Sequence, residues 1–146
     1  MASNYERTHG LSTVTAATVS INADAHVGMP VVLNRAAGCV ATLPAATGSG
    51  NTYNFIGAAD ASGDQKIQVT GNDTMAGVAY LGNDSAGASC FYTAATSDTI
   101  TLDGSTTGGL KGWRVTCTDM AADTWAVMVM SEASGTEATP FSAAVS

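Results

Sequence analysis

Short runs of apolar and β-branched residues, separated by turn residues, recur along most of the chain. In residues 64–70, Ile67 and Val69 alternate with polar neighbours, which is the pattern of a strand that buries one face. Residues 124–130 form the most apolar run and predict a central strand. The predicted strands are residues 31–33, 39–43, 53–55, 64–70, 78–81, 90–93, 98–102, 113–117 and 124–130.

Turn residues and the lack of helical periodicity predict the fold class. Residues 71–77 and 82–87 each begin with Gly-Asn-Asp, in which Asn, Asp and Gly tolerate left-handed backbone. No segment keeps an amphipathic helical period over ten residues, so we expect helix at most in residues 94–98 or 120–123. Many short strands joined by Gly-rich turns predict an all-β protein, either an antiparallel β-sandwich or a jelly-roll-like small barrel.

The domain organisation predicted is an extended N-terminal arm, residues 1–22, followed by a single β domain, residues 23–146. Residues 1–11 mix charged, aromatic and polar types without periodicity, as termini outside a core do. Residues 12–22 are rich in Thr and Val, and two interpretations stay open: a strand, or an extended segment that becomes ordered on a partner. The C-terminal tail, residues 135–146, predicts an edge strand or a second arm.

Small polar residues must cover most of the protein surface. Charged residues are 12% of the 146 residues, about half the usual share, so Ser, Thr, Asn, Gly and Ala form the exposed face. Such side chains lose little rotamer entropy when another chain covers them. This composition fits two classes of protein equally well: a subunit of an assembly and a plain secreted or virion β domain.

The charge balance limits the classes of partner. The net charge is −7 and the five basic residues form no cluster, which argues against nucleic acid or an anionic membrane as partner. Nothing approaches the roughly 18 consecutive apolar residues of a membrane-spanning helix. The first residues lack a basic segment followed by an apolar run, so we expect no signal peptide and synthesis in a cytoplasm.

No residue pattern predicts catalysis or metal binding. Histidine occurs only at His9 and His26, and neither has the local context of a Ser–His–Asp arrangement. Asp98 and Asp103 bracket a predicted strand and are better explained as solvated turn acids than as the paired carboxylates of a glycosidase. Each Gly-Asn-Asp turn supplies one carboxylate and one amide, too few oxygens for calcium. We therefore expect no enzymatic activity, no metal and no cofactor.

Cysteine and tryptophan residues are expected in the core rather than in a site. Cys39, Cys90 and Cys117 are too widely spaced for a disulfide framework or a zinc site. Cys39 and Cys117 lie in apolar or β-branched runs and are expected to be buried. Trp113 and Trp125 are expected to form a cross-strand pair in the core.

Several motifs stand out between residues 31 and 145. They are a strand ending in TLPAATGSG (residues 42–50), an aromatic strand with Tyr53 and Phe55, the loop GSTTGG (residues 104–109), a strand containing Trp125 and a GT-ATPF tail (residues 135–141). Together they resemble the motifs of a group of small virion proteins of tailed bacteriophages. The shared motifs are structural turns, and the resemblance implies no catalytic residues.

The resemblance implies a head decoration (cement) protein. Copies would lie on the outside of the assembled virion capsid, bound to the major capsid protein, as homotrimers at local three-fold axes. The protein would be made in the host cytoplasm. A phage fibre or receptor-binding β module is the alternative, although a fibre normally has a repeated or coiled-coil stalk, which this chain lacks.

Contact with the capsid lattice is expected from the N-terminal arm. An extended arm can add a strand to an exposed sheet edge and gain main-chain hydrogen bonds without a pocket. The candidate contact residues are Tyr5, Arg7, Val14, Val19 and Ile21.

Overall fold

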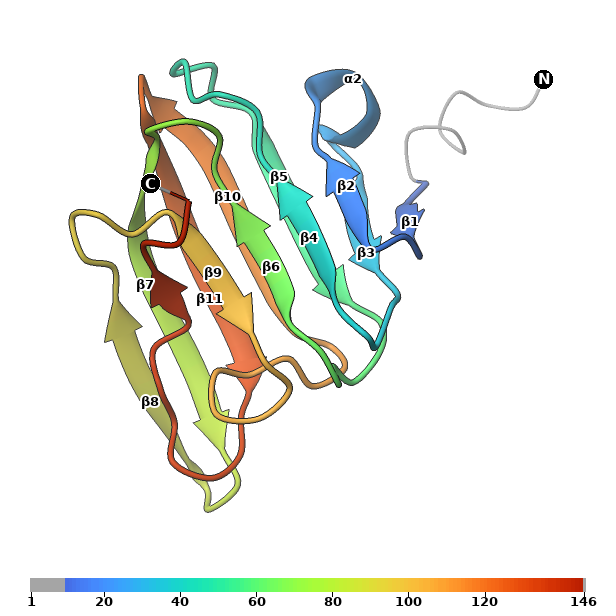
Figure 1. Ribbon diagram of the computed structural model, residues 1–146, viewed down its shortest axis with the longest axis vertical. Helices are drawn as coiled ribbons and strands as arrows, with labels where there is room; N and C mark the ends of the chain where they lie inside the picture. The colour runs from blue at the N-terminus through green and yellow to red at the C-terminus, as the bar shows by residue number, and fades with distance from the viewer. Residues whose placement is uncertain (1–9, 146) are drawn as a thin grey trace.

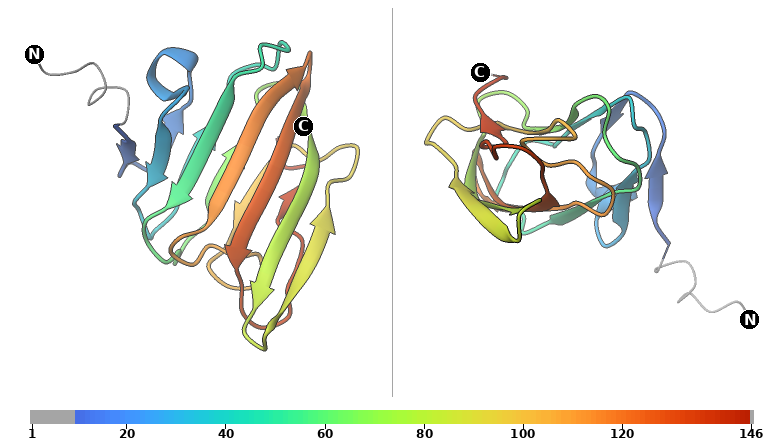
Figure 2. Two further views of the ribbon diagram at one scale, coloured as in Figure 1. Left: turned by 180° about the vertical axis from the view of Figure 1, so that it is seen from behind. Right: turned by 90° about the horizontal axis from the view of Figure 1, so that it is seen from below.

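Two β-sheets packed face to face make up residues 10–145, which are the residues that the computed structural model describes (Figure 1, Figure 2). The structure is 49% strand and 3% helix, so the expected all-β fold with a sandwich arrangement is confirmed. The seven-stranded sheet has the order β1 (Ser12–Val14), β3 (Pro30–Leu33), β5 (Thr52–Gly57), β10 (Arg114–Ala121), β11 (Thr124–Glu132), β7 (Thr74–Asn83) and β8 (Gly87–Tyr92). The five-stranded sheet has the order β12 (Phe141–Ser142), β9 (Thr99–Leu102), β6 (Gln65–Gln68), β4 (Cys39–Thr42) and β2 (Thr18–Ser20).

Half of the ten strand pairings are parallel, so the prediction of an antiparallel sandwich is wrong for half of the structure. The first six strands alternate between the two sheets. β1, β3 and β5 pair in parallel in one sheet, while β2, β4 and β6 pair in parallel in the other. Because the chain crosses to the opposite sheet after each strand, it returns to its own sheet in the same direction. A jelly roll built from antiparallel strands does not describe this order.

Aromatic side chains fill the space between the sheets. Trp125, Tyr53 and Phe55 are at most 1% exposed, and the rings of Tyr53 and Trp125 lie 5.9 Å apart at 50°. Trp113 is also buried, but the expected cross-strand pair of tryptophans is wrong. The β10–β11 register places Asp119 opposite Trp125, six positions along the strand from Trp113.

Trp113 packs instead against a glycine of β5. A Cβ added at Gly57 would overlap the Nε1, Cδ1 and Cε2 atoms of the Trp113 indole. Gly57 is itself hydrogen bonded to Trp113, since its amide donates to the Trp113 carbonyl at 3.0 Å. Glycine at position 57 therefore makes room for the largest side chain at this end of the core.

The described part of the expected N-terminal arm belongs to the sandwich. β1 pairs with β3 and β2 pairs with β4, so the interpretation of residues 12–22 as strand is confirmed for Ser12–Val14 and Thr18–Ser20, which lie in different sheets. Val14 is 8% exposed and Ile21 4%, and both belong to the hydrophobic core. Residues 1–9, with Tyr5 and Arg7, lie outside the described residues.

Helix in the described residues is confined to α2 (Ala23–His26), whose N-terminus is capped by Asn22. The Asn22 side chain accepts a hydrogen bond from the Ala25 amide at 2.9 Å. The expected helical turns are not found: residues 94–98 form a turn, and β10 runs to Ala121 before a turn in which Asp123 has φ 61°.

The TLPAATGSG motif is held by the carboxylate of Asp119 on β10. The amides of Thr47, Gly48 and Ser49 donate to the two carboxylate oxygens at 2.7 to 3.1 Å, and the Ser49 hydroxyl donates at 2.6 Å. Gly48 has φ 78°, which turns successive amides toward one anion. Burial by itself raises the pKa of Asp119, but the hydrogen bonds from Ser49, Thr47 and Gly48 outweigh burial and lower the pKa to about 2.

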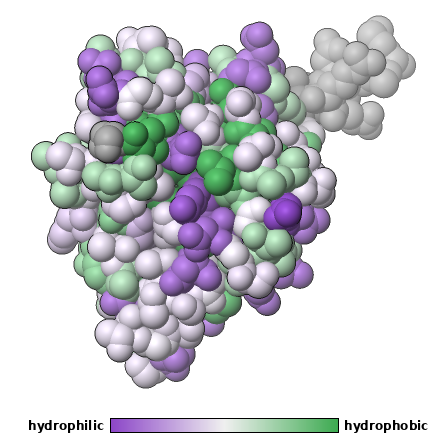
Figure 3. All heavy atoms as spheres, in the orientation of Figure 1, coloured by the Kyte–Doolittle hydropathy of each residue, from purple (hydrophilic) through white to green (hydrophobic). Residues whose placement is uncertain are grey.

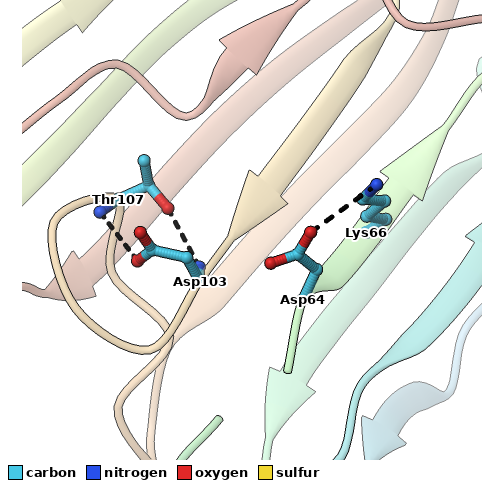
Figure 4. Close-up of polar contacts among 4 residues, drawn as sticks. All are labelled: Asp64, Lys66, Asp103 and Thr107. Atoms are coloured by element: carbon cyan, nitrogen blue, oxygen red, sulfur yellow. Dashed lines mark hydrogen bonds and ion pairs between the residues drawn. The ribbon is translucent and has the colours of Figure 1, made fainter. Parts of the chain in front are cut away.

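The GSTTGG motif is closed by a second carboxylate (Figure 4). Asp103 Oδ1 accepts hydrogen bonds from the amides of Ser105 at 2.8 Å and Thr107 at 3.0 Å, and the Asp103 amide donates to the Thr107 hydroxyl at 2.9 Å. Burial opposes ionisation, yet the hydrogen bonds dominate and lower the pKa of Asp103. Asp103 is therefore a turn acid, as expected, and its carboxylate is hydrogen bonded to backbone amides of its own loop.

The expectation of a solvated turn acid is wrong for Asp98, which is 1% exposed. Its Oδ1 accepts hydrogen bonds from the amides of Ala144 at 2.8 Å and Val145 at 3.2 Å. Phe141 and Ser142 pair with β9, and Phe141 is 7% exposed. Of the two interpretations for the tail, the edge strand is confirmed.

Replacing Asp119 by Asn should lower the free energy of unfolding by roughly 2 kcal/mol at pH 7, from the difference between a pKa of about 2 folded and 3.8 unfolded. Because the pKa is depressed in the folded state, this stabilisation is complete above about pH 5 and is lost as the pH falls through 3.8 and then through about 2. Urea unfolding of the unaltered protein and D119N at pH 7 and pH 2 measures it. Exposed Asp24, changed to Asn, is the control; an equal difference at both pH values would contradict the charge-based account.

Replacing Gly57 by Ala should lower the free energy of unfolding by about 1–3 kcal/mol, because the added methyl group displaces the Trp113 indole. Gly82→Ala on β7 is the matched control, since the nearest atom to an added Cβ there is the Ser131 carbonyl oxygen at 3.9 Å. Thermal unfolding followed by tryptophan fluorescence compares the two variants. A midpoint for G57A equal to that of G82A would show that the core adjusts without cost.

Candidate interaction surface

The outer face of the five-stranded sheet is polar. In Figure 3, hydrophilic side chains gather over the middle of this sheet, which faces the viewer. Lys66 and Gln68 of β6 point outward there, and the Lys66 ammonium lies 3.6 Å from the Asp64 carboxylate (Figure 4). This face has the character of a hydrated protein surface.

The outer face of the seven-stranded sheet is different, because large apolar side chains are exposed on three neighbouring strands. Tyr80 of β7 is 46% exposed, Tyr92 of β8 74%, and Met128 and Met130 of β11 47% and 54%. The strand registers place Met130 beside Tyr80, and Val78 between Met128 and Tyr92. We call Tyr80, Tyr92, Met128 and Met130 the Met–Tyr patch.

Unpaired charges lie at one border of the Met–Tyr patch. Arg114 of β10 is opposite Met130, and a shallow hollow of about 500 Å³ is lined by Tyr80, Lys111, Arg114, Met130 and Glu132 among others. In residues 10–145 the one ion pair is Lys66–Asp64, so Lys111, Arg114 and Glu132 make none. A Tyr- and Met-rich centre bordered by Arg is typical of protein interfaces.

The described residues contain no arrangement suited to a metal ion. No group of three or more His, Cys, Asp or Glu side chains comes together in residues 10–145. His26 is buried, and its Nδ1 lies 3.0 Å from the Asn22 amide, within the α2 turn. Asp98 and Asp103 bind backbone amides of the tail and of the GSTTGG loop. No helix among the described residues is long and apolar enough to cross a membrane.

The candidate contact residues of the arm do not form a surface in the part that is described. Val14 and Ile21 are buried in the core, and Val19 packs against it, because their strands close one end of the sandwich. Tyr5 and Arg7 lie outside the described residues. In this conformation the Val14 and Ile21 side chains are not accessible to a partner.

Sequence reasoning missed the Met–Tyr patch, although a signal for it was present. In β11 (Thr124–Glu132), the residues that point inward are Trp125, Val127 and Val129, and Met128 and Met130 point outward. The apolar run at residues 124–130 predicts a central strand, and β11 does lie between β10 and β7. Its outer face, with Met128 and Met130, is exposed.

The three cysteines differ in accessibility. Cys39 and Cys117 are at most 1% exposed, as expected, and Cys90 on β8 is exposed. Burial raises the pKa of the Cys117 thiol, and burial outweighs the nearby Arg35 in raising the pKa of Cys39. Reactivity toward thiol reagents should therefore be confined to Cys90.

Comparisons with known proteins return no relatives: no family model, no curated protein and no solved structure matches this chain. The fold and surface define the protein as a β-sandwich with an exposed apolar patch on one sheet face. The resemblance of its motifs to those of phage virion proteins stays a prediction from the sequence.

In the folded protein, a thiol-specific reagent at pH 8 should modify one cysteine rapidly, and three after denaturation, because Cys39 and Cys117 are shielded by the core. The number of modified thiols is read from absorbance or intact mass. C90S is the control and should abolish the rapid reaction. Fast modification of C90S would mean that the core opens at the buried cysteines.

Proposed function

We propose that this protein is a bacteriophage head decoration (cement) protein, which binds the major capsid protein on the outside of the assembled head and stabilises it. The observation that carries the proposal is the Met–Tyr patch, a group of large apolar side chains exposed on the outer face of the seven-stranded sheet. The TLPAATGSG, GSTTGG and GT-ATPF motifs support the same group of proteins through their resemblance.

The size of the Met–Tyr patch fits the centre of a protein interface. With about 200 Å² for each full side chain, the four residues expose on the order of 400 Å². That area equals the largest apolar patches of typical monomers, which are often functional. A specific interface buries about 800 Å² on each partner, so the border with Arg114, Lys111 and Glu132 would supply the remainder.

The mechanism of stabilisation is mass action. A protein that binds only the assembled lattice shifts the equilibrium toward it by an amount set by its concentration and affinity, about 2.7 kcal/mol per site at 100 times Kd. A rigid domain loses little conformational entropy on docking, and the carboxylates of Asp119, Asp103 and Asp98 hold its loops in place before binding. Residues 1–9, with Tyr5 and Arg7, are proposed to add capsid contacts of their own.

The double variant Met128→Lys, Met130→Lys should bind capsids that lack this protein roughly 100-fold more weakly, because two methionines that become buried in the proposed interface are replaced by charges that must be desolvated. Co-sedimentation with purified capsids measures the affinity. Gln68→Lys on the polar face is the matched control and should bind normally. A truncation of residues 1–9 leaves β1 intact and measures the contribution of Tyr5 and Arg7.

Two results would contradict the proposal in different ways. Normal binding by the double methionine variant would show that another surface meets the capsid. Failure of the unaltered protein to bind capsids, together with binding to host cells, would favour the fibre or receptor-binding module.

A further inference from the structure

Strand β8 is an edge of the seven-stranded sheet with a free outer side (Figure 1, Figure 2). It pairs with β7 alone among the described strands. Ala88, Cys90 and Tyr92 are exposed along it, and Ser89 and Phe91 are half-buried.

The other three sheet edges are short, and β8 is not. β1 and β2 have three residues each and β12 has two, whereas β8 has six, with the sequence GASCFY. β8 contains no charge and no proline, and its register with β7 is unbroken. Proteins usually protect long edges with charges, prolines or bulges, because unpaired backbone groups there recruit another strand. β8 has none of these protections.

The backbone geometry leaves alternate residues of β8 ready to pair. The Thr93 amide donates to the Gly77 carbonyl at 3.1 Å, which fixes the alternation of the adjoining ladder. Phe91 and Ser89 therefore direct their amides and carbonyls toward β7, and those of Cys90 and Ala88 point away from the sheet.

Charge and symmetry favour a second copy of this chain as the occupant. Two chains of net charge −7 repel, so self-association requires a contact without acids. β8 is uncharged, and two acids near its ends are held by hydrogen bonds within their own chain: Asp84 accepts from the Gly135 amide at 3.3 Å and Glu137 from the Ser89 hydroxyl at 3.5 Å. Identical antiparallel strands are self-complementary about a two-fold axis.

We propose that β8 pairs antiparallel with the β8 of a second copy, which joins two seven-stranded sheets into one across a two-fold axis. The axis runs perpendicular to the sheet, so both Met–Tyr patches lie on the same side of the joined sheet. The Met128 and Met130 side chains of the two copies then remain exposed on that side, with an area on the order of 400 Å² in total.

The strand contact itself is smaller than a standard interface, so we expect a dimer in equilibrium with monomer. Its apolar part comes mainly from Tyr80 and Tyr92, which at 46% and 74% exposed contribute roughly 240 Å² per copy. Two copies also bind a repeating lattice more tightly than one through the effective concentration of the second site. The homotrimer implied by the resemblance would need a different contact, and molecular mass distinguishes the two.

A charge introduced at Cys90 tests the pairing in the isolated protein. Sedimentation equilibrium should give a concentration-dependent mass rising toward twice that of the monomer. C90K and C90E, which place like charges across the axis, should each weaken the dimer at least about tenfold, and a mixture of the two should restore it. Thr18→Lys, on the short edge strand β2, is the matched control and should dimerise normally.

The native Cys90 thiol provides a second readout. In the two antiparallel registers with the greatest overlap that use the outward groups, Cys90 faces either the Cys90 or the Ala88 of the second copy, so a short bis-maleimide should link two chains. C90S should abolish the link, because Cys39 and Cys117 are buried.

The outcomes separate this proposal from the proposed function. A monomer or trimer at all concentrations, or a dimer unaffected by C90K and C90E, would overturn β8 pairing whatever the result with capsids. Capsid binding without β8 pairing would leave the decoration role intact, and pairing without capsid binding would leave the dimer and remove the role.

Discussion

The hydrogen bonds between the Asp119 carboxylate and residues 47–49 are the interaction on which the architecture depends. The loop that they hold carries the chain from β4 in one sheet to β5 in the other. β5 is where the parallel half of the seven-stranded sheet meets β10. Two hydroxyls and three amides donate to this buried carboxylate, and these hydrogen bonds offset the cost of removing it from water. Without them, this crossing would leave both a charge and amides unsatisfied.

Hydrogen bonds of this kind occur elsewhere in the structure. Backbone amides of other loops and of the C-terminal tail also donate to aspartate side chains. The aspartates that accept such bonds are Asp60, Asp73, Asp84, Asp98, Asp103 and Asp119. Much of the chain's acidity is therefore internal to its loops. The net charge of −7 consequently overstates how acidic the sheet faces are, and the Met–Tyr patch and β8 are uncharged. Those are the two surfaces through which the proposed contacts are made.

Features that depend on neighbouring residues could be predicted from the sequence, and features that depend on residues far apart in the chain could not. The alternation of Ile67 and Val69 and the apolar run at 124–130 identified strands β6 and β11, since side-chain alternation is a property of the strand itself. Burial of Cys39 and Cys117 was predicted from the apolar or β-branched runs around them. Asp98 was misjudged because its partners, the amides of Ala144 and Val145, are more than forty residues away in the sequence.

The sequence by itself determined the strands, the turns and the all-β class, because each depends on neighbours within a few residues. Only the tertiary structure decided that half of the pairings are parallel, that residues 12–20 join the sheets and that Trp125 meets Tyr53. It also decided that Met128 and Met130 face outward uncovered and that β8 is an edge. The physical reason is that strand order depends on where the chain crosses between sheets, and those crossings are set by contacts between residues far apart in the chain.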